Sequence, residues 1–386
     1  MISTRPTWTE ISRSHLVHNY GLLRRLAGPQ TEVVAVIKAN AYGHGLAACA
    51  QTLENAGAQR FGVTCVEEGV ALRRACPEAA ILIMSGLCAQ EADAAIEHRL
   101  TPVVWEAPHL QWLAAAARKH GLRTAEVPVH LEIDAGMSRQ GAAPEQIEPL
   151  LEHFGPDSPL RLEALMTHFP SPEDRGTTHR QQRRFLDIAD RIHARGIPFD
   201  ALSAGSSAGV LQREPPDCLD AWTAQKQLRR IVRTGIALYG CSPLQAPLDS
   251  SVQPKPVLAW KTRIVSLRTI EPGTSVGYDA TFTAQRISRL ALLPVGYGDG
   301  LNRLLSNHGS VLVRGQRAPI AGRISMDHTV VDVTDIPGAA SGDEVVLIGE
   351  QDGNRTTADD LAAATGTIAY EVLCAISARV PRGMVD

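Results

Sequence analysis

The stretch VVAVIKANAYGHG, residues 33–45, decides the fold. It opens with a continuous apolar run from Val33 to Ile37, and the run ends abruptly at Lys38. A strand with one face in water alternates apolar and polar residues, so this run predicts a strand that is buried on both faces. Lys38 then lies where the strand leaves the core. Desolvation there is expected to lower the pKa of its amine and make it a nucleophile.

Seven further apolar, β-branched runs follow through the first two thirds of the chain. They are residues 60–66, 79–85, 101–105, 127–134, 160–169, 198–204 and 230–240. Between most of them lie segments rich in alanine, leucine and charged residues, with helical spacing. Eight buried strands alternating with helices predict an α/β fold, a (β/α)8 TIM-type barrel over residues 1–245. A doubly wound open sheet is the alternative.

The amino-acid composition of the sequence changes near residue 245. Residues 244–256 are rich in proline, serine and aspartate, which is typical of a linker. Beyond it, alternating segments separated by glycine- and proline-rich turns predict a mostly antiparallel β domain. This C-terminal β domain is expected to span residues 246–386 and to be closed by one or two helices around residues 356–378.

The composition argues against several classes of function. The chain has 386 residues, with 38 basic against 41 acidic side chains and no basic block, which disfavours nucleic acid or an anionic membrane as the main partner. The first residues lack the apolar core of a signal peptide, and no run approaches transmembrane length. Seven scattered cysteines never adopt CxxC spacing, so we expect a cytoplasmic, reduced protein without a metal site.

Polar side chains gather at the predicted carboxyl ends of the strands, where such barrels carry their chemistry. Besides Lys38, these ends hold Arg139, His168, Ser206, Ser207, Arg233 and Gly235. Loops after the late strands often bind a phosphate, and AGSSAG and RTGI offer hydroxyl and backbone N–H groups there. A phosphate at one side and a poised lysine at the other outline a pyridoxal phosphate site, with the lysine holding the aldehyde as a Schiff base.

Each of these residues, taken singly, also fits an ordinary structural role. GYGDG (296–300) lacks the GxGxxG spacing of a dinucleotide loop and is expected to form a turn. Tyr278 is more informative, because a tyrosine after a glycine in a turn of the β domain has no evident core to fill. Local packing within that turn is the alternative interpretation.

The chain resembles the bacterial alanine racemases over essentially its full length. The motifs AVIKANAYGHG, IDAGMSRQG, MTHF, RTGIALYGCSP, VGYDATF, LPVGYGDGLNR, GRISMDHTVVDVTD and AYEVLCAISARVPR follow in the family's order. The resemblance implies an isomerase that interconverts L- and D-alanine by a two-base mechanism on a pyridoxal 5′-phosphate aldimine, supplying D-alanine for peptidoglycan. It also implies a homodimer in which each active site joins one subunit's barrel to the other's β domain.

The resemblance also assigns roles to individual residues. The catalytic bases would be Lys38 and Tyr278. The cofactor-binding residues would be Lys38, Tyr42, His168, Ser207, Arg233, Gly235, Ile236 and Tyr370. The substrate-binding residues would be Arg139, Met326 and Tyr297, with Glu132 and Asp327 in support. Arg233 would face the pyridine nitrogen, and since arginine does not readily give up a proton, the ring would be a weaker electron sink.

The chain departs from the commonest family pattern in two places that matter for the site. Glu132 stands seven residues before Arg139, where the family usually carries a lysine modified to an anionic carbamate. We expect the Glu132 carboxylate to pair with the Arg139 guanidinium in its place. Ser206 and Ser207 replace the usual Asn-Ser pair, which leaves the interaction of the asparagine amide open.

Other functions are compatible with the same fold. One is a racemase of broader scope that accepts serine, lysine or arginine; such enzymes are typically exported, and the lack of a signal peptide argues against it. Another is a non-catalytic pyridoxal phosphate-binding protein, which usually lacks the β domain that carries Tyr278 here. A decarboxylase of related architecture is disfavoured because its characteristic motifs are absent.

Overall fold

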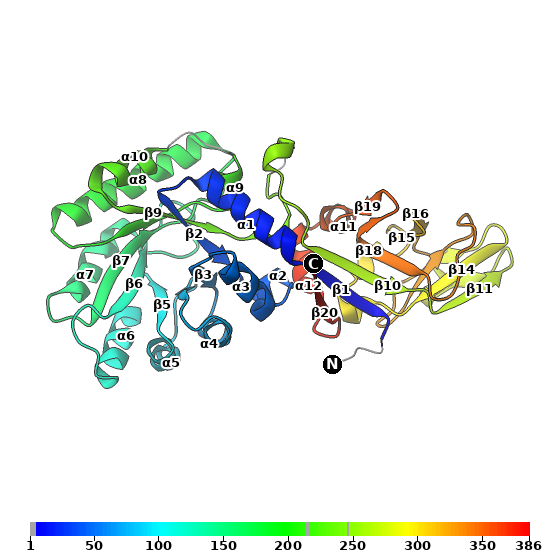
Figure 1. Cartoon of the computed structure of the whole chain (residues 1–386), viewed down its shortest axis with the longest axis horizontal. Helices are drawn as coiled ribbons and strands as arrows, with labels where there is room; N and C mark the ends of the chain where they lie inside the picture. Colours follow the sequence, from blue (N-terminus) through cyan, green and yellow to red (C-terminus); the bar gives the residue numbers. More distant parts are fainter. Residues whose placement is uncertain (1–4, 213–216, 245–246) are drawn as a thin grey trace. The chain divides into compact units, whose positions relative to one another are not determined.

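The structure, a computed structural model, describes residues 5–212, 217–244 and 247–386. It divides into two compact units (Figure 1). The barrel unit comprises Leu16–Ala41 and Leu46–Pro254, and the β unit comprises Met1–His15, Tyr42–Gly45 and Lys255–Asp386. The chain therefore passes between the two units several times, once within the motif KANAYGHG.

Eight parallel strands form a closed barrel in the barrel unit. They are β2 (Thr31–Val36), β3 (Arg60–Val63), β4 (Ala80–Ile83), β5 (Leu100–Val104), β6 (Val127–Glu132), β7 (Leu160–Met166), β8 (Ala201–Ser203) and β9 (Arg229–Thr234). Each strand pairs with the next, and β9 pairs with β2 to close the ring. This confirms the predicted (β/α)8 barrel, and its eight strands match the eight apolar runs.

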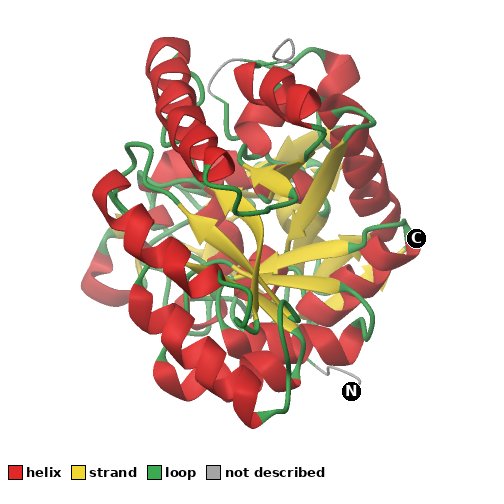
Figure 2. Ribbon diagram, turned by 90° about the vertical axis from the view of Figure 1, so that its left-hand side faces the viewer, coloured by secondary structure: helices red, strands yellow, loops and turns green. Residues whose placement is uncertain are grey.

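Helices surround the barrel strands (Figure 2). They are α1 (Arg13–Ala27), α3 (Leu46–Asn55), α4 (Val66–Ala75), α5 (Ala92–Glu97), α6 (Ala107–Lys119), α7 (Ile147–Leu151), α8 (Arg175–Ala194), α9 (Ser207–Leu211) and α10 (Cys218–Lys226). Because helices cover the outside while side chains fill the inside, a strand such as β5 is buried at every residue. That double burial is why the sequence shows continuous apolar runs.

An ionic cluster lies within the barrel, towards the starts of its strands. Glu163 on β7 accepts hydrogen bonds from Arg60 at 2.9 Å and from His130 at 3.2 Å, and Arg60 also pairs with Glu32 at 2.7 Å. Burial raises the pKa of Glu163, but His130 and Arg60 outweigh it and hold that pKa below its usual value. These paired charges are structural, and they leave the carboxyl ends of the strands as the place for chemistry.

The β unit is built on antiparallel strands, as predicted. They are β1 (Thr7–Ser12), β10 (Leu258–Arg263), β11 (Ser266–Ile270), β12 (Ser275–Val276), β13 (Phe282–Thr283), β14 (Ser288–Leu293), β15 (Ser310–Val313), β16 (Gln316–Pro319), β17 (Thr329–Asp332), β18 (Glu344–Gln351), β19 (Asn354–Thr356) and β20 (Arg382–Val385). The largest sheet has the order β16-β15-β18-β10-β1-β20, and only the β1–β20 pair in it is parallel. The first strand of the chain, β1, thus lies within the β unit.

Two helices complete the β unit, α11 (Ala358–Thr365) and α12 (Ala369–Ala375), at the predicted place. Over the described ranges, no helix combines the length and the apolar character needed to cross a bilayer. The same residues contain no cluster of three or more histidine, cysteine, aspartate or glutamate side chains arranged to hold a metal ion.

Candidate functional site

Lys38 follows strand β2 and opens a left-handed turn, α2 (Lys38–Tyr42). The next four residues, none of them glycine, have φ angles between 51° and 56°. An L-residue in this conformation is disfavoured by about 1–2 kcal/mol, so four in succession persist only where surrounding contacts hold them. Two of the contacts are hydrogen bonds from Ala39 N–H to Glu68 Oε1, at 2.6 Å, and from Leu46 N–H to Asn40 Oδ1, at 2.8 Å.

Arg233, near the end of β9, is 6% exposed and donates only to uncharged groups. Its acceptors are Ser203 Oγ at 2.9 Å, the Thr167 carbonyl at 2.7 Å and His168 Nδ1 at 3.4 Å. Burial lowers the pKa of Arg233 to about 10, although the charge of Glu132 raises it. A guanidinium that remains protonated in such surroundings favours an anionic or electron-rich ligand.

His168, directly after β7, is held neutral. Burial lowers its pKa to about 3, with the charges of Arg233, Arg139 and Lys38 acting in the same direction. Since arginine only donates, Nδ1 of His168 must accept the bond from Arg233, and the ring proton resides on Nε2. The ring therefore presents an N–H donor among three cationic side chains.

Glu132, the last residue of β6, is 3% exposed and accepts a hydrogen bond from Gln140 Nε2 at 2.5 Å. The predicted ion pair between Glu132 and Arg139 does not form. Among residues 5–212, 217–244 and 247–386, Arg139 makes no ion pair, and Gln140 donates to the Glu132 carboxylate instead. Burial raises the pKa of Glu132, and the bond from Gln140 and the charges of Arg233 and Arg139 oppose the rise. Arg139 acts on the carboxylate through space and remains exposed for a ligand.

Two short helical turns begin next to one another after strands β8 and β9. Ser207 starts α9, and its Oγ accepts hydrogen bonds from the backbone N–H of Gly235 at 3.0 Å and of Ala237 at 3.4 Å. Ile236 starts the 3-10 turn Ile236–Tyr239. The first N–H groups of a helical turn have no acceptor within that turn, so this place offers donors suited to a phosphate.

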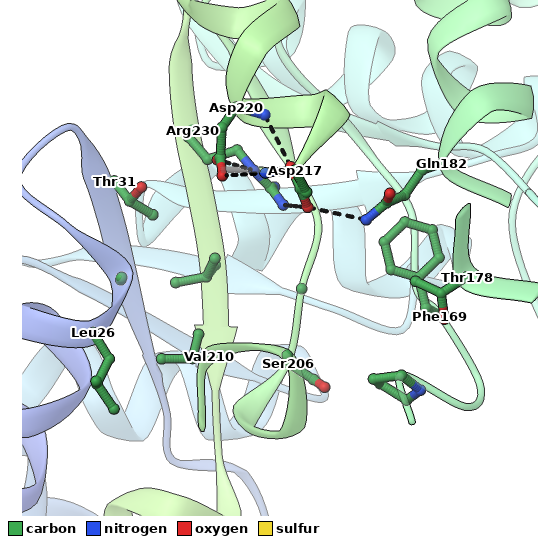
Figure 3. Close-up of a pocket in the computed structure, with 15 residues that line it drawn as sticks. Leu26, Thr31, Phe169, Thr178, Gln182, Ser206, Val210, Asp217, Asp220 and Arg230 are labelled. Atoms are coloured by element: carbon green, nitrogen blue, oxygen red, sulfur yellow. Dashed lines mark hydrogen bonds and ion pairs between the residues drawn. The ribbon is translucent and has the colours of Figure 1, made fainter. Parts of the chain in front are cut away.

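A cavity of about 100 Å³ adjoins the loop between β8 and α9, and its lining includes Ser206, Thr178, Gln182 and Arg230. Figure 3 shows Arg230 between Asp220 and Asp217, with Gln182 beyond. Arg230 is buried, and its Nη1 donates to the Ala204 carbonyl at 2.7 Å, which fixes the start of the loop. Ser206 lines this space with a side chain shorter than the family's asparagine.

Two of the candidate tyrosines, Tyr42 and Tyr370, lie close together in the β unit. Their ring centroids are 6.0 Å apart. Tyr42 is buried, and burial raises its pKa, so this phenol stays protonated. Gly43 packs so tightly against α12 that an added Cβ would approach the Leu373 carbonyl oxygen to 2.2 Å. The motif KANAYGHG therefore requires glycine at this position.

The remaining candidates of the β unit lie on three adjoining loops. Tyr278 is 70% exposed, and its turn is attached to the loop carrying Met326 by an ion pair between Asp279 and Arg323, at 2.6 Å. The backbone N–H of Tyr297 donates to Ser325 O at 3.0 Å, which joins the third loop to the same one. Tyr278 and Tyr297 are thus both exposed side chains on a connected surface.

Asp327 is tied to that connected surface through an arginine. It accepts from Arg379 Nη2 at 2.7 Å, and Arg379 Nε lies 3.4 Å from the fully buried Asp299. Asp299 in turn accepts from the backbone N–H of Gly296, which precedes Tyr297. GYGDG forms the expected turn.

Two family models account for nearly the whole chain. The model described as "Alanine racemase, N-terminal domain" matches residues 11–243, and the model described as "Alanine racemase, C-terminal domain" matches residues 257–384. The chain belongs to the alanine racemase family. Proteins of this family are isomerases, and the chain is an enzyme of that class.

Individual alanine racemases match the chain from end to end. Sequence identity is 43% to that of Sorangium cellulosum, over 98% of either chain, and 39% to that of Halothermothrix orenii, over 98% of this chain and 97% of the relative. The alanine racemase of Bacillus anthracis with bound L-Ala-P superposes with a TM-score of 0.89 at 27% identity, covering 100% of this chain and 96% of the other. The alanine racemase of Bartonella henselae with covalently bound pyridoxal phosphate superposes with a TM-score of 0.84 at 27% identity, covering 98% of this chain and 99% of the other.

Several residues around the candidate site were not anticipated from the sequence. Gln140, Ser203 and Thr167 each contact a proposed site residue. Ser203 ends β8 and Thr167 directly follows β7, and that position is the signal that would have found them. Gln140 lies in the loop eight residues beyond the end of β6 and gave no such signal. Glu68 gave no such signal, because it lies inside helix α4 and reaches the Lys38 turn only in the folded chain.

Proposed function

We propose that this alanine racemase family member interconverts L- and D-alanine with pyridoxal 5′-phosphate bound to Lys38, supplying D-alanine for peptidoglycan. The observation that carries the proposal is the setting of Lys38, whose turn holds a strained conformation at the mouth of a barrel. Lys38, Arg233 and Arg139 lie close enough to His168 for their charges to help keep it neutral. The relatives named alanine racemase support the substrate.

The residues of the barrel unit fit pyridoxal phosphate in three respects. Lys38 supplies the amine that would bind the aldehyde. The N–H groups at Ser207 and Ile236 would hold the phosphate, next to Gly235, whose own N–H donates to Ser207 Oγ, and beside a loop that Arg230 fixes. Arg233 would face the ring nitrogen with a donor, and the family resemblance assigns Tyr42 and Tyr370 to the phosphate as well.

When bound, pyridoxal phosphate withdraws electrons from the amino acid's Cα and makes the proton there removable. Racemisation needs a base on each face of that carbon. We assign Lys38 to one face and Tyr278 to the other. The exposed side chain of Tyr278 is free to serve a site outside its own turn, and the Asp279–Arg323 pair holds the backbone beside it.

The charged residues would position the substrate. Arg139, exposed and without an ion pair over the described ranges, would bind the alanine carboxylate as its counter-charge, helped by the Met326 backbone. Glu132 would balance the positive charges of Arg139 and Arg233. Tyr297, near Asp327, would narrow the entrance and so favour a small side chain.

The first experiment tests the cofactor and its lysine together. Purified holoenzyme is reduced with borohydride, digested and mapped by mass spectrometry, and racemisation is measured over a panel of L-amino acids. We expect a pyridoxyl adduct on Lys38 and fastest turnover with alanine. An adduct on another lysine would overturn the site, and equal rates with lysine or arginine would replace alanine racemase by a broader racemase.

The second experiment tests the proposed homodimer with shared sites. Lys38→Ala and Tyr278→Phe should each be nearly inactive, because each removes one base. After subunit exchange, half of the dimers are mixed, and in each of them one site carries both lesions and the other is intact. Roughly a quarter of wild-type activity should return. No recovery, with exchange shown independently by mass spectrometry, would place both bases in one subunit.

A further inference from the structure

Three hydrogen bonds within the barrel unit help to hold the turn that carries Lys38. Two of them are local: Ala41 N–H donates to Ile37 O at 2.9 Å, and Asn40 Oδ1 accepts from Leu46 N–H. The third comes from a different segment, because Glu68 Oε1 accepts the Ala39 N–H at 2.6 Å. A left-handed turn without glycine needs such an external contact to persist.

The Glu68 carboxylate uses both of its oxygens. While Oε1 accepts from Ala39, Oε2 accepts the backbone N–H of Thr64 at 2.9 Å. Thr64 directly follows β3, the barrel neighbour of the strand that ends before Lys38. One side chain therefore joins the Lys38 turn to the end of the adjacent strand, and only a carboxylate offers two equivalent charged acceptors for this.

We infer that Glu68 is a positioning residue for Lys38, which fixes the lysine amine by holding the N–H of the next residue. This inference rests on the proposed role of Lys38 as cofactor lysine and base. The competing interpretation is that Glu68 merely caps helix α4, in whose first turn it lies. Both interpretations use the bond to Thr64, whereas the bond to Ala39 serves positioning alone.

The test compares Glu68→Gln with a matched control, Glu91→Gln. Glu91 also lies at a helical N-terminus of the barrel unit and accepts one backbone N–H, that of Cys88 at 2.6 Å, but it touches no part of the Lys38 turn. Glutamine keeps the size of the side chain and leaves one N–H facing an amide NH2. Glu68→Asp keeps the charge but is one methylene too short to bridge both N–H groups, and it serves if Glu68→Gln does not fold.

Three measurements are made on each variant: affinity of the apoprotein for pyridoxal phosphate, by absorbance; free energy of unfolding of the apoprotein; and deuterium isotope effects with Cα-deuterated L- and D-alanine. A hydrogen bond to a charged group corresponds to about a ten- to hundredfold change in an equilibrium constant, so Glu68→Gln should weaken cofactor affinity by about that factor. Its isotope effect should rise for one enantiomer only, the one whose proton Lys38 removes. Glu91→Gln should leave the cofactor affinity and the isotope effects unchanged.

The outcomes separate the inference from the function on which it rests. If Glu68→Gln loses stability like Glu91→Gln but keeps wild-type cofactor affinity and both isotope effects, Glu68 is only a helix cap and the inference is wrong. Equal rises of the isotope effect for both enantiomers would also overturn it. Failure of the proposed function would be visible in the wild type itself, as absent racemisation or an adduct away from Lys38.

Discussion

Replacing Gln140 by leucine should uncouple the buried carboxylate of Glu132 from its donor. The Gln140 amide nitrogen donates to Glu132 Oε2 at 2.5 Å and to the Met84 carbonyl at 3.0 Å, so both of its hydrogens are used. Leucine is similar in size and has no donor. Glu132 is too buried for water to substitute freely, and the variant leaves a carboxylate oxygen without its partner.

The magnitude follows from the worth of that bond. A hydrogen bond to a charged group contributes about 1.5–3 kcal/mol, which corresponds to about 1–2 pH units. Burial already raises the pKa of Glu132, and the bond from Gln140 is among the interactions that oppose the rise. Gln140→Leu should therefore raise the pKa of Glu132 further. The acid limb of kcat/KM, where Glu132 becomes protonated, should move to higher pH.

Stability should respond with a defined sign. A carboxyl group whose folded pKa is raised favours the folded state most at low pH and loses that contribution as pH rises through the folded pKa. Gln140→Leu should thus be destabilised by about 1.5–3 kcal/mol at neutral pH, and by less at a pH where Glu132 is already protonated. In a protein that already carries Glu132→Gln, Gln140→Leu should lower the free energy of unfolding by only about 1 kcal/mol, because residue 132 then has no carboxylate charge.

The assay couples D-alanine formation to a chromogenic oxidase at a series of pH values, with urea unfolding at an acidic and at a neutral pH. An unshifted acid limb in Gln140→Leu would show that Gln140 does not control the ionisation of Glu132. A loss of stability that is the same at both pH values, or in both backgrounds, would refute the charge argument even if activity fell.

Three further changes test other parts of the site. Burial and three cations lower the pKa of His168 to about 3, so between pH 6.5 and pH 3 the unfolded chain binds a proton that the folded chain does not. The wild type therefore loses stability as the pH falls through this range. His168→Gln should abolish up to about 5 kcal/mol of that loss, measured by urea titration. Ser206→Asn should extend into the cavity beside it and raise the unfolding free energy by up to about 1 kcal/mol, whereas a loss would mean that the space cannot take the amide. Arg323→Ala, which removes a mostly exposed ion pair, should change stability by less than about 1 kcal/mol yet lower kcat through the turn of Tyr278, and an unchanged kcat would contradict this.

The barrel strands could be predicted because their environment leaves a simple mark on the sequence. A barrel strand packs against interior side chains on one face and against helices on the other, so most of its residues are apolar, as in residues 33–36 of β2 and in the fully buried β5. Strands β1 and β20 left no comparable mark. TWTEIS and RGMV are short and mixed in polarity, and they pair with each other across almost the full length of the chain. Only the folded sheet makes strands of them.

The site could be predicted in its residues but not in its contacts. Glu132 and Arg139 have the spacing of the family's carbamate pair, yet the loop between them does not extend. Asp134 accepts backbone N–H groups of the following residues, at 2.8–3.1 Å, and Ala142 N–H returns to the Glu132 carbonyl at 2.8 Å. This reversal brings Gln140, not Arg139, to the carboxylate. The spacing of two residues in the sequence does not specify which side chain of a folded loop reaches the carboxylate.

The left-handed turn after Lys38 is the feature that local rules exclude most firmly. KANAY contains no glycine, and each of its last four residues adopts a conformation that L-residues avoid. This conformation lowers the stability of the folded chain, and hydrogen bonds from the backbone to Glu68 and Asn40 hold it in place. Arg233 lies in the same part of the barrel unit, buried without a carboxylate among its hydrogen-bond partners. The strain of this turn and a buried guanidinium that is hydrogen-bonded to no carboxylate both destabilise the protein alone. The charge of Glu132 offsets that of Arg233 only in part, since burial still lowers the pKa of Arg233. An anionic ligand bound beside Arg233 would add a further counter-charge, so its binding should raise the free energy of unfolding.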